Sequence, residues 1–151
     1  MLFKKIRGAA FFAILSISFI HAAEVGIPFG FGGSPFGLGG SQYVGVRIHV
    51  TDFYAVQPSV QMSLTENDNN LGLHVDNLFY LTEMNSLEQY AGFNVAFNLD
   101  DDFRLGGFYG LQHSINQSVD VYGQIGLGID LDPAVVYTAN TGLGVIFYIQ
   151  R

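Results

Sequence analysis

The sequence predicts an all-β fold, an antiparallel up-and-down transmembrane β-barrel of eight strands that follows a cleaved signal peptide. Three observations predict this fold. Long segments alternate between apolar and polar residues with period two, the pattern of a β-strand with one apolar face. The apolar rows carry no charge between their ends. The 151 residues allow one domain, and the stretches between the segments are short enough for hairpins.

Residues 118–132 form the clearest of these segments. Apart from Gly123, its odd positions from Val119 to Leu131 are apolar, and its even positions carry Ser, Asp, Tyr, Gln and Gly. The segment is longer than the usual soluble strand of about 5–6 residues. It reaches the roughly 9–11 residues with which a tilted strand crosses a bilayer.

Residues 1–22 are predicted to be a signal peptide, and residues 23–151 the barrel domain. Lys4, Lys5 and Arg7 make the start basic, and the apolar run 8–20 is too short for a spanning helix of about 20 residues. We place the cleavage after Ala22. The chain has no Cys, which excludes a lipid-anchored N-terminus, a disulfide framework, a thiolate metal site and a Cys nucleophile.

Removing residues 1–22 leaves a strongly acidic chain. Its basic residues are then Arg47, Arg104 and Arg151 against thirteen Asp and Glu, so the net charge is −10 with His neutral. Such a surface does not attract nucleic acid or anionic headgroups by counterion release, and we expect no nucleic-acid partner.

The predicted strands follow one another along the barrel domain. In residues 24–40, Val25, Ile27 and Phe29 alternate with Gly and Pro, which indicates either a first strand with a Gly-rich loop or an ordered tail. In residues 71–81, Asn77 and Leu78 interrupt the two rows, so we expect a β-bulge there. Seven further strands are clearer, at 42–50, 53–65, 71–81, 89–99, 103–113, 118–132 and 141–151. Because bacterial outer-membrane barrels have an even number of strands, this count favours a strand in residues 24–40 as the eighth.

The connections divide between the two ends of this barrel. With the C-terminus in the periplasm, residues 51–52, 82–88 and 114–117 become periplasmic turns. Residues 33–41, 66–70, 100–102 and 133–140 become short, acidic outer loops.

The composition of the polar face indicates which side is wet. A solvated face is expected to be rich in Lys, Glu and Thr, whereas this one consists mainly of Gly, Tyr, Gln, Asn and Ser. That mixture suits a narrow, packed lumen in which Gly makes space for Tyr, with the apolar face turned to lipid. The alternative is a soluble exported β-barrel with its apolar face inward, binding a small apolar ligand.

Seven ionisable residues fall on the inward face. We expect them to form a network that plugs the lumen and satisfies itself, with a proton or ion path as the alternative. Arg104 and Asp130 lie on neighbouring strands and are predicted to pair diagonally across the hairpin. The inward set is Arg47, His49, His74, Asp76, Arg104, Asp120 and Asp130.

No motif predicts catalytic, cofactor-binding or metal-binding residues. His113 and Ser114 resemble part of a hydrolytic triad, which would make the protein a lipid-modifying enzyme, but they stand at the periplasmic end and no acid is placed beside them. The acidic stretches 66–68 and 100–102 lack the spacing of a calcium loop, so we expect solvated turns. The glycines of residues 26–40 have no following helix and no phosphate-loop Lys, which gives no support to nucleotide binding.

Several segments resemble the family of small outer-membrane β-barrel proteins of Gram-negative bacteria, a porin-like group. They are GVRIHVTDFYAVQPSV at 45–60, FRLGGFYGLQHSI at 103–115, VYGQIGLGID at 121–130 and TGLGVIFYIQ at 141–150. The resemblance implies an outer-membrane location, contact with membrane lipid and lipopolysaccharide, and insertion by the barrel-assembly machinery. The motifs are generic to this architecture and do not indicate one activity. We expect a monomer with a structural or surface-interaction role and no catalysis. The chain ends on Arg151, where the family usually ends on an aromatic residue.

Overall fold

A computed structural model describes residues 24–33, 40–65, 68–84, 86–98, 103–130 and 136–150. The predicted signal peptide lies outside these residues. No helix in the described ranges is long and apolar enough to cross a membrane. The structure contains nine strand segments: β1 (Glu24–Gly33), β2 (Gly40–Gly45), β3 (Arg47–Thr51), β4 (Tyr54–Thr65), β5 (Asp68–Met84), β6 (Leu87–Asn98), β7 (Phe103–Asn116), β8 (Val119–Asp130) and β9 (Val136–Gln150).

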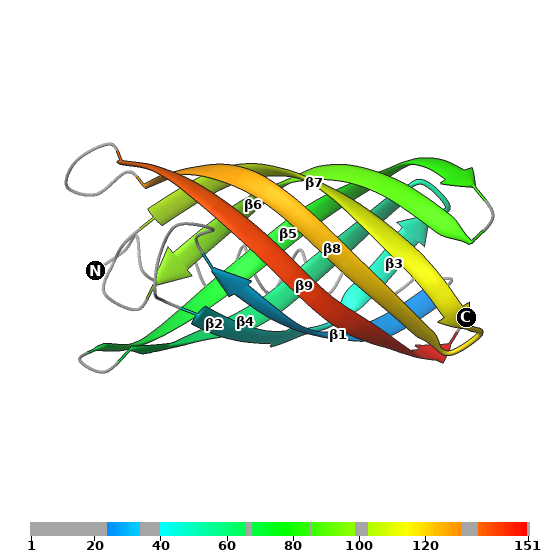
Figure 1. The fold of residues 1–151 in the computed structure, drawn as a ribbon, viewed down its shortest axis with the longest axis horizontal. Helices are drawn as coiled ribbons and strands as arrows, with labels where there is room; N and C mark the ends of the chain where they lie inside the picture. Colours follow the sequence, from blue (N-terminus) through cyan, green and yellow to red (C-terminus); the bar gives the residue numbers. More distant parts are fainter. Residues whose placement is uncertain are drawn as a thin grey trace, which may run out of the picture.

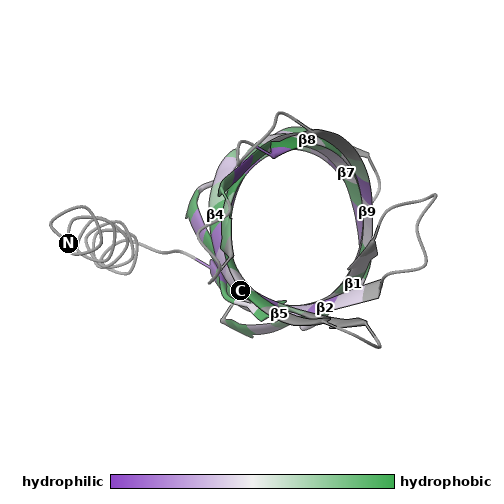
Figure 2. Cartoon of the chain, turned by 90° about the vertical axis from the view of Figure 1, so that its left-hand side faces the viewer, coloured by the Kyte–Doolittle hydropathy of each residue, from purple (hydrophilic) through white to green (hydrophobic). Residues whose placement is uncertain are grey.

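The strands close into one antiparallel barrel. From β3 to β9 each strand pairs with the next along the chain, and β9 pairs with β1. β2 and β3 succeed each other in one position, with β1 on one side and β4 on the other. The nine segments therefore form eight barrel strands, which are tilted in Figure 1 and form a closed ring in Figure 2. The uncertain first strand is confirmed as β1.

Prolines on both neighbouring strands separate β2 from β3. The pairing with β4 keeps one register across the break, because Gly45 pairs with Ser59 before it and Ile48 with Val56 after it. Val46 therefore faces Pro58, and its N–H donates to the Pro58 carbonyl at 2.9 Å. Pro58 has no N–H with which to return the bond. On the other side, the register places Pro28 opposite Gly45.

The strands extend beyond the predicted ends. β5 begins at Asp68 and β9 at Val136, both inside predicted loops. The predicted turn 82–88 is also wrong, because β5 continues to Met84 and β6 starts at Leu87. Likewise, β7 runs through most of the predicted turn 114–117. A hydrogen-bonded ladder can continue after the apolar alternation has stopped, because its bonds come from the backbone.

The predicted bulge is in a different place. Asn77 pairs in regular register with Val56 and with Phe93, and the Tyr54 hydroxyl donates to its side-chain oxygen at 2.8 Å. The register instead shifts four residues later, between Tyr80 and Thr82. The polar Asn77 in an apolar row therefore marks a side-chain hydrogen bond to the neighbouring strand β4 and not a bulge.

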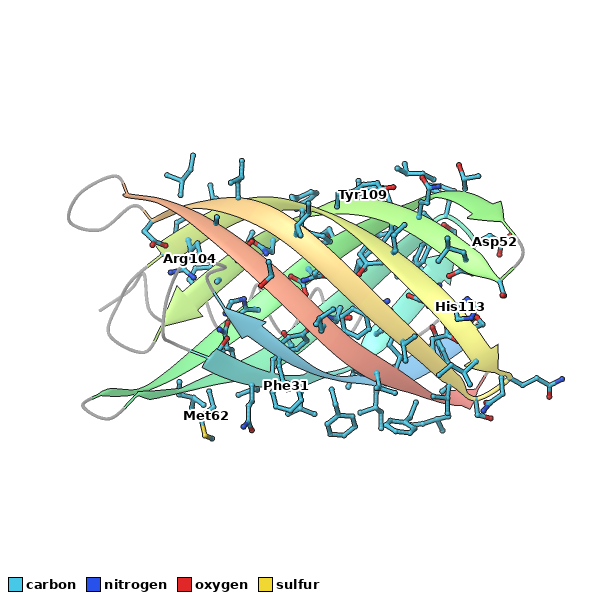
Figure 3. All side chains as sticks on the ribbon, in the orientation of Figure 1. Phe31, Asp52, Met62, Arg104, Tyr109 and His113 are labelled. Carbon is cyan, nitrogen blue, oxygen red and sulfur yellow. The ribbon has the colours of Figure 1, made fainter. Side chains whose placement is uncertain are left out.

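The two faces are those that the alternation predicts. The large apolar side chains project outward and are exposed, as Phe31 and Met62 show in Figure 3. Ile48 and Val56, a cross-strand pair in the outward rows, are buried. Inward positions supply two small buried apolar clusters, one of Ala55, Leu78, Tyr90 and Phe108 and the other of Tyr122, Ile146 and Tyr148.

Candidate functional site: a hydrogen-bonded strut across the lumen

Arg47 lies at the centre of the hydrogen-bond network in the lumen. The alternation of β3 turns its side chain inward, where it is fully buried. Its Nε donates to Oε1 of Gln57 on the neighbouring β4 at 2.7 Å. Its Nη1 donates to Oε1 of Gln112 on β7 at 2.5 Å. Because β7 is not a neighbour of β3 in the sheet, the second bond is made through the lumen.

Each glutamine passes the connection on to a buried carboxylate. Gln57 Nε2 donates to Oδ2 of Asp76 at 3.0 Å, and Gln112 Nε2 donates to Oδ2 of Asp120 at 2.7 Å. Both amides accept from the guanidinium and donate to an acid, so each has one consistent orientation. We call the resulting chain, Asp76–Gln57–Arg47–Gln112–Asp120, the lumen strut; all five residues are buried.

The charged side chains of the strut are buried, and hydrogen bonds take the place of water around them. Burying an ionised side chain is costly unless the charge is paired and its polar atoms are bonded. Here one guanidinium is linked through amides to two carboxylates. Its Nη2 has no hydrogen-bond partner among the described residues, so the prediction that the network satisfies itself is not fully met. Removing any central member therefore takes away a hydrogen-bond partner from at least one buried charge.

Tyrosines surround the guanidinium. Its central carbon lies 5.2 Å from the ring centroid of Tyr122 and 5.7 Å from that of Tyr90, which are cation–π distances. Nη1 also reaches the Tyr80 hydroxyl at 3.3 Å, and Gln112 Nε2 donates to the Tyr148 hydroxyl at 3.0 Å. The hydroxyls of Tyr43 and Tyr122 are hydrogen-bonded to each other.

Glycines make room for these rings, as the composition predicts. A Cβ on Gly110 would overlap Cζ of Tyr90, and one on Gly30 would overlap Cζ of Tyr43. A Cβ on Gly144 would lie 2.6 Å from the Tyr122 hydroxyl. The inward glycines thus let large side chains fill a narrow barrel.

The inward histidine His49 adds to the lumen packing. Its ring stacks on Tyr80 with centroids 5.1 Å apart, and its Nε2 lies 3.5 Å from the Tyr80 hydroxyl. His74 lies on the inward face of β5, two residues along from Asp76.

Arg104 and Asp130 pair at the loop end of the barrel, where Figure 3 labels Arg104. They lie directly opposite each other in the register of β7 and β8, so the predicted diagonal geometry is wrong. Two parallel bonds join them: Nε donates to Oδ1, and Nη2 donates to Oδ2 at 3.1 Å. Their side chains are 34% and 24% exposed, which separates this pair from the buried strut.

The candidate hydrolytic pair is not assembled. His113 and Ser114 are successive residues of β7 and so point to opposite faces of the wall. His113 is exposed at the turn end (Figure 3), where its Nδ1 lies 3.2 Å from the backbone oxygen and 3.5 Å from Oγ of Ser86. Ser86 lies in the tight turn between β5 and β6.

Within the described ranges, no three His, Asp or Glu residues gather as a metal site would require. Residues 66–67 and 100–102, which carry the candidate acidic clusters, lie outside those ranges, and Asp68 is the first residue of β5.

The two glutamines of the strut were missed in the sequence. Gln57 and Gln112 lie in inward rows, as the alternation predicts, but the predicted lumen network contains only Arg, His and Asp. The sequence does hold a signal for them: a Gln side chain both donates and accepts hydrogen bonds, so an inward Gln can connect an Arg to an Asp.

No family model and no curated protein matches the chain. Solved structures match it in fold. The N-terminal β-barrel domain of Pseudomonas aeruginosa OprF has a TM-score of 0.70 at 12% identity, covering 85% of this chain and 98% of that chain. Neisserial surface protein A has a TM-score of 0.60 at 11% identity, covering 82% of this chain and 94% of that chain. Yersinia pestis outer membrane protein Ail has a TM-score of 0.53 at 13% identity, covering 83% of this chain and 99% of that chain. The chain therefore has the closed β-barrel fold that these proteins share.

Proposed function

We propose, with this shared fold as the premise, that the protein is an integral β-barrel of a bacterial outer membrane. Its role is structural or one of surface interaction, its lumen is plugged by side chains, and it performs no catalysis. Three of the solved structures that share its fold are two bacterial surface or outer-membrane proteins and one barrel domain.

One observation carries the proposal: the polarity of the barrel is the reverse of a soluble one. Leu127 and Leu143 on the outside are 72% and 68% exposed, whereas Arg47 in the lumen is fully buried. A soluble barrel would place these leucines inward and the charges in water. Lipid supplies the solvent that such an outer face requires, and closure leaves no unpaired strand edge in it. This polarity therefore counts against the alternative of a soluble barrel that binds an apolar ligand in its lumen.

The strut supports a plugged lumen. It connects β5, β4 and β3 on one side to β7 and β8 on the other through four side-chain hydrogen bonds. Tyr80, Tyr90 and Tyr122 contact the guanidinium from further inward positions. An eight-stranded barrel is just wide enough to be filled in this way.

The lipid-modifying enzyme has less support. Its candidate base, His113, contacts the turn residue Ser86, and the adjacent Ser114 faces the lumen. A hydrolytic triad requires a nucleophile, a base and an orienting acid within hydrogen-bond reach of one another.

The remaining parts of the proposal concern biogenesis and partners. Residues 1–22 export the chain, the barrel-assembly machinery inserts it as a monomer, and membrane lipid and lipopolysaccharide surround it. The short outer connections then face the cell exterior, and the C-terminus faces the periplasm.

Fractionation of a Gram-negative host that expresses the full chain tests the membrane assignment. The protein is expected to sediment with the outer membrane, to resist a urea wash and to require detergent for release. Release by urea would contradict the assignment. In planar bilayers the purified protein is expected to carry no steady current, and a steady current would contradict the plug.

Deleting the protein from its own cell separates the two roles. A structural role changes the detergent sensitivity of the envelope, whereas a pure surface-interaction role leaves it unchanged.

A further inference from the structure

All register shifts between the described strands lie at one end of the barrel. They occur in the pairs β1–β9, β3–β4, β5–β6 and β7–β8, close to the turns and the end of β9. The pairs that meet at the opposite end, β1–β2, β4–β5, β6–β7 and β8–β9, keep a regular register throughout. Strands β3, β5, β7 and β9 run toward this end, which holds the turns between β3 and β4, β5 and β6, and β7 and β8 (Figure 1). Each of these four strands contains one extra residue.

The extra residue is apolar every time, and a polar residue follows it. We call the four extra residues the bulge collar: Val50, Leu81, Ile115 and Ile149. The residues after them are Thr51, Thr82, Asn116 and Gln150. The same order in four strands of different sequence indicates one physical requirement at that level.

The bulges of β5 and β7 each turn two successive residues to the outside. On β5, Tyr80 faces the lumen, yet Leu81 and Thr82 are both exposed, and Thr82 pairs with the outward position of Gln89. On β7, Ile115 and Asn116 are likewise both exposed. Regular alternation would have sent one of each two inward. These bulges thus place apolar and polar side chains next to each other on the outer surface near the turn end.

The distance from the far end of the apolar belt fits a bilayer. The outward apolar row of β5 begins at Leu71 and ends at Leu81. At about 3.3 Å per residue and a strand tilt of about 40°, this run measures about 25 Å along the barrel axis. The apolar band of outer-membrane barrels is about 25 Å tall.

Two amide side chains in outward rows near the collar, those of Asn77 and Gln89, have tyrosine partners. The Tyr54 hydroxyl donates to Asn77 at 2.8 Å, and the Tyr109 hydroxyl donates to Gln89 Oε1 at 3.0 Å. A polar group exposed to hydrocarbon needs such a partner, whereas one in water does not. Both pairs are therefore suited to a level at which water becomes scarce.

We propose that the bulge collar is a lipid-contact ring that binds the glycerol and headgroup boundary of the phospholipid leaflet on the turn side. Its apolar residues enter the acyl-chain edge, and the polar residues that follow them bond the ester and headgroup region. The ring fixes the height of the barrel in the membrane from that side. This inference rests on the proposed membrane location.

Tryptophan fluorescence tests the collar, because the chain contains no Trp. The full barrel domain carrying Leu81→Trp, Thr82→Trp or Ile125→Trp is folded into phosphatidylcholine vesicles. The lipid carries bromine either close to the glycerol backbone or close to the end of the acyl chain. Ile125 lies midway along β8 and is 65% exposed, so it serves as the mid-belt control. Bromine quenches a tryptophan that lies at the same depth.

The collar predicts that shallow bromine quenches the Leu81→Trp and Thr82→Trp variants more strongly than deep bromine does, and that the reverse holds for Ile125→Trp. Quenching of both collar variants by deep bromine, or of only one of them by shallow bromine, would overturn the collar while the mid-belt control still reports a membrane-spanning barrel. If the Ile125→Trp variant is quenched by neither lipid, the membrane location fails together with the collar.

Discussion

The guanidinium of Arg47 and the side-chain amide of Gln112 are joined at 2.5 Å from opposite sides of the barrel. Three strands, β4, β5 and β6, separate the two residues in the sheet. Gln112 also donates to Asp120 and to the Tyr148 hydroxyl. This one amide therefore connects the buried cation, a buried acid and a tyrosine across the lumen.

Gln112→Ala is expected to destabilise the barrel by at least about 3 kcal/mol, because it leaves the charges of Arg47 and Asp120 without their amide partner. The measurement is urea-induced unfolding in lipid vesicles. Gln124→Ala is the matched control, since Gln124 accepts one bond from the Tyr90 hydroxyl and its loss is expected to cost about 1 kcal/mol. Equal losses in the two variants would show that the strut adds nothing special.

Arg47→Ala is expected to let ions through the barrel, because it removes the centre of the plug and leaves Asp76 and Asp120 in the lumen. The leak should favour cations, which the remaining carboxylates attract. Single-channel recording in planar bilayers measures it. Arg104→Ala, at the partly exposed loop end, serves as the control and should stay closed. A silent Arg47→Ala barrel that has folded would mean that other side chains close the lumen.

Gly110→Ala and Gly107→Ala compare the two faces of β7. The new Cβ at position 110 would overlap the Tyr90 ring, so overpacking is expected to cost about 1–3 kcal/mol. At position 107 its nearest contact would be 3.8 Å away, on the outer face, and little change is expected. Unfolding midpoints of the two variants measure the difference. A stable Gly110→Ala barrel would contradict the tight fit of ring over glycine.

Arg104→Ala is expected to lower stability by no more than about 1 kcal/mol, and less at high salt, because its pair with Asp130 is partly exposed. It should still lower stability more than Arg151→Ala. Urea unfolding at low and high salt gives both values. A loss in Arg104→Ala that does not change with salt would argue against an electrostatic contribution.

The alternation of residues was sufficient to predict the two faces of the barrel. Arg47, Asp76 and Asp120 were placed inward because each lies in a row of polar residues, and the structure buries all three. The partners across the lumen were beyond this reasoning. The alternation along a strand assigns a residue to one face of the sheet. Only the closure of the sheet brings the inward side chains of β3 and β7 together across the lumen.

The strand ends and the bulges were predicted less well. Side-chain alternation reports the apolar belt, whereas the ladder of β5 continues on backbone bonds to Met84. Asn77 indicated a bulge from sequence because its partner, Tyr54, lies on another strand. Leu81 gave no signal, since the extra residue of a bulge is recognised only from the register of its neighbour.

Migration on a detergent gel, boiled against unboiled, tests most directly that the chain is a closed barrel with its apolar face outward. We expect that the unboiled protein, taken from outer membranes, runs as a compact barrel and that boiling shifts its mobility. A protein that is soluble without detergent and shows no shift on boiling would contradict a closed barrel with an apolar outer face.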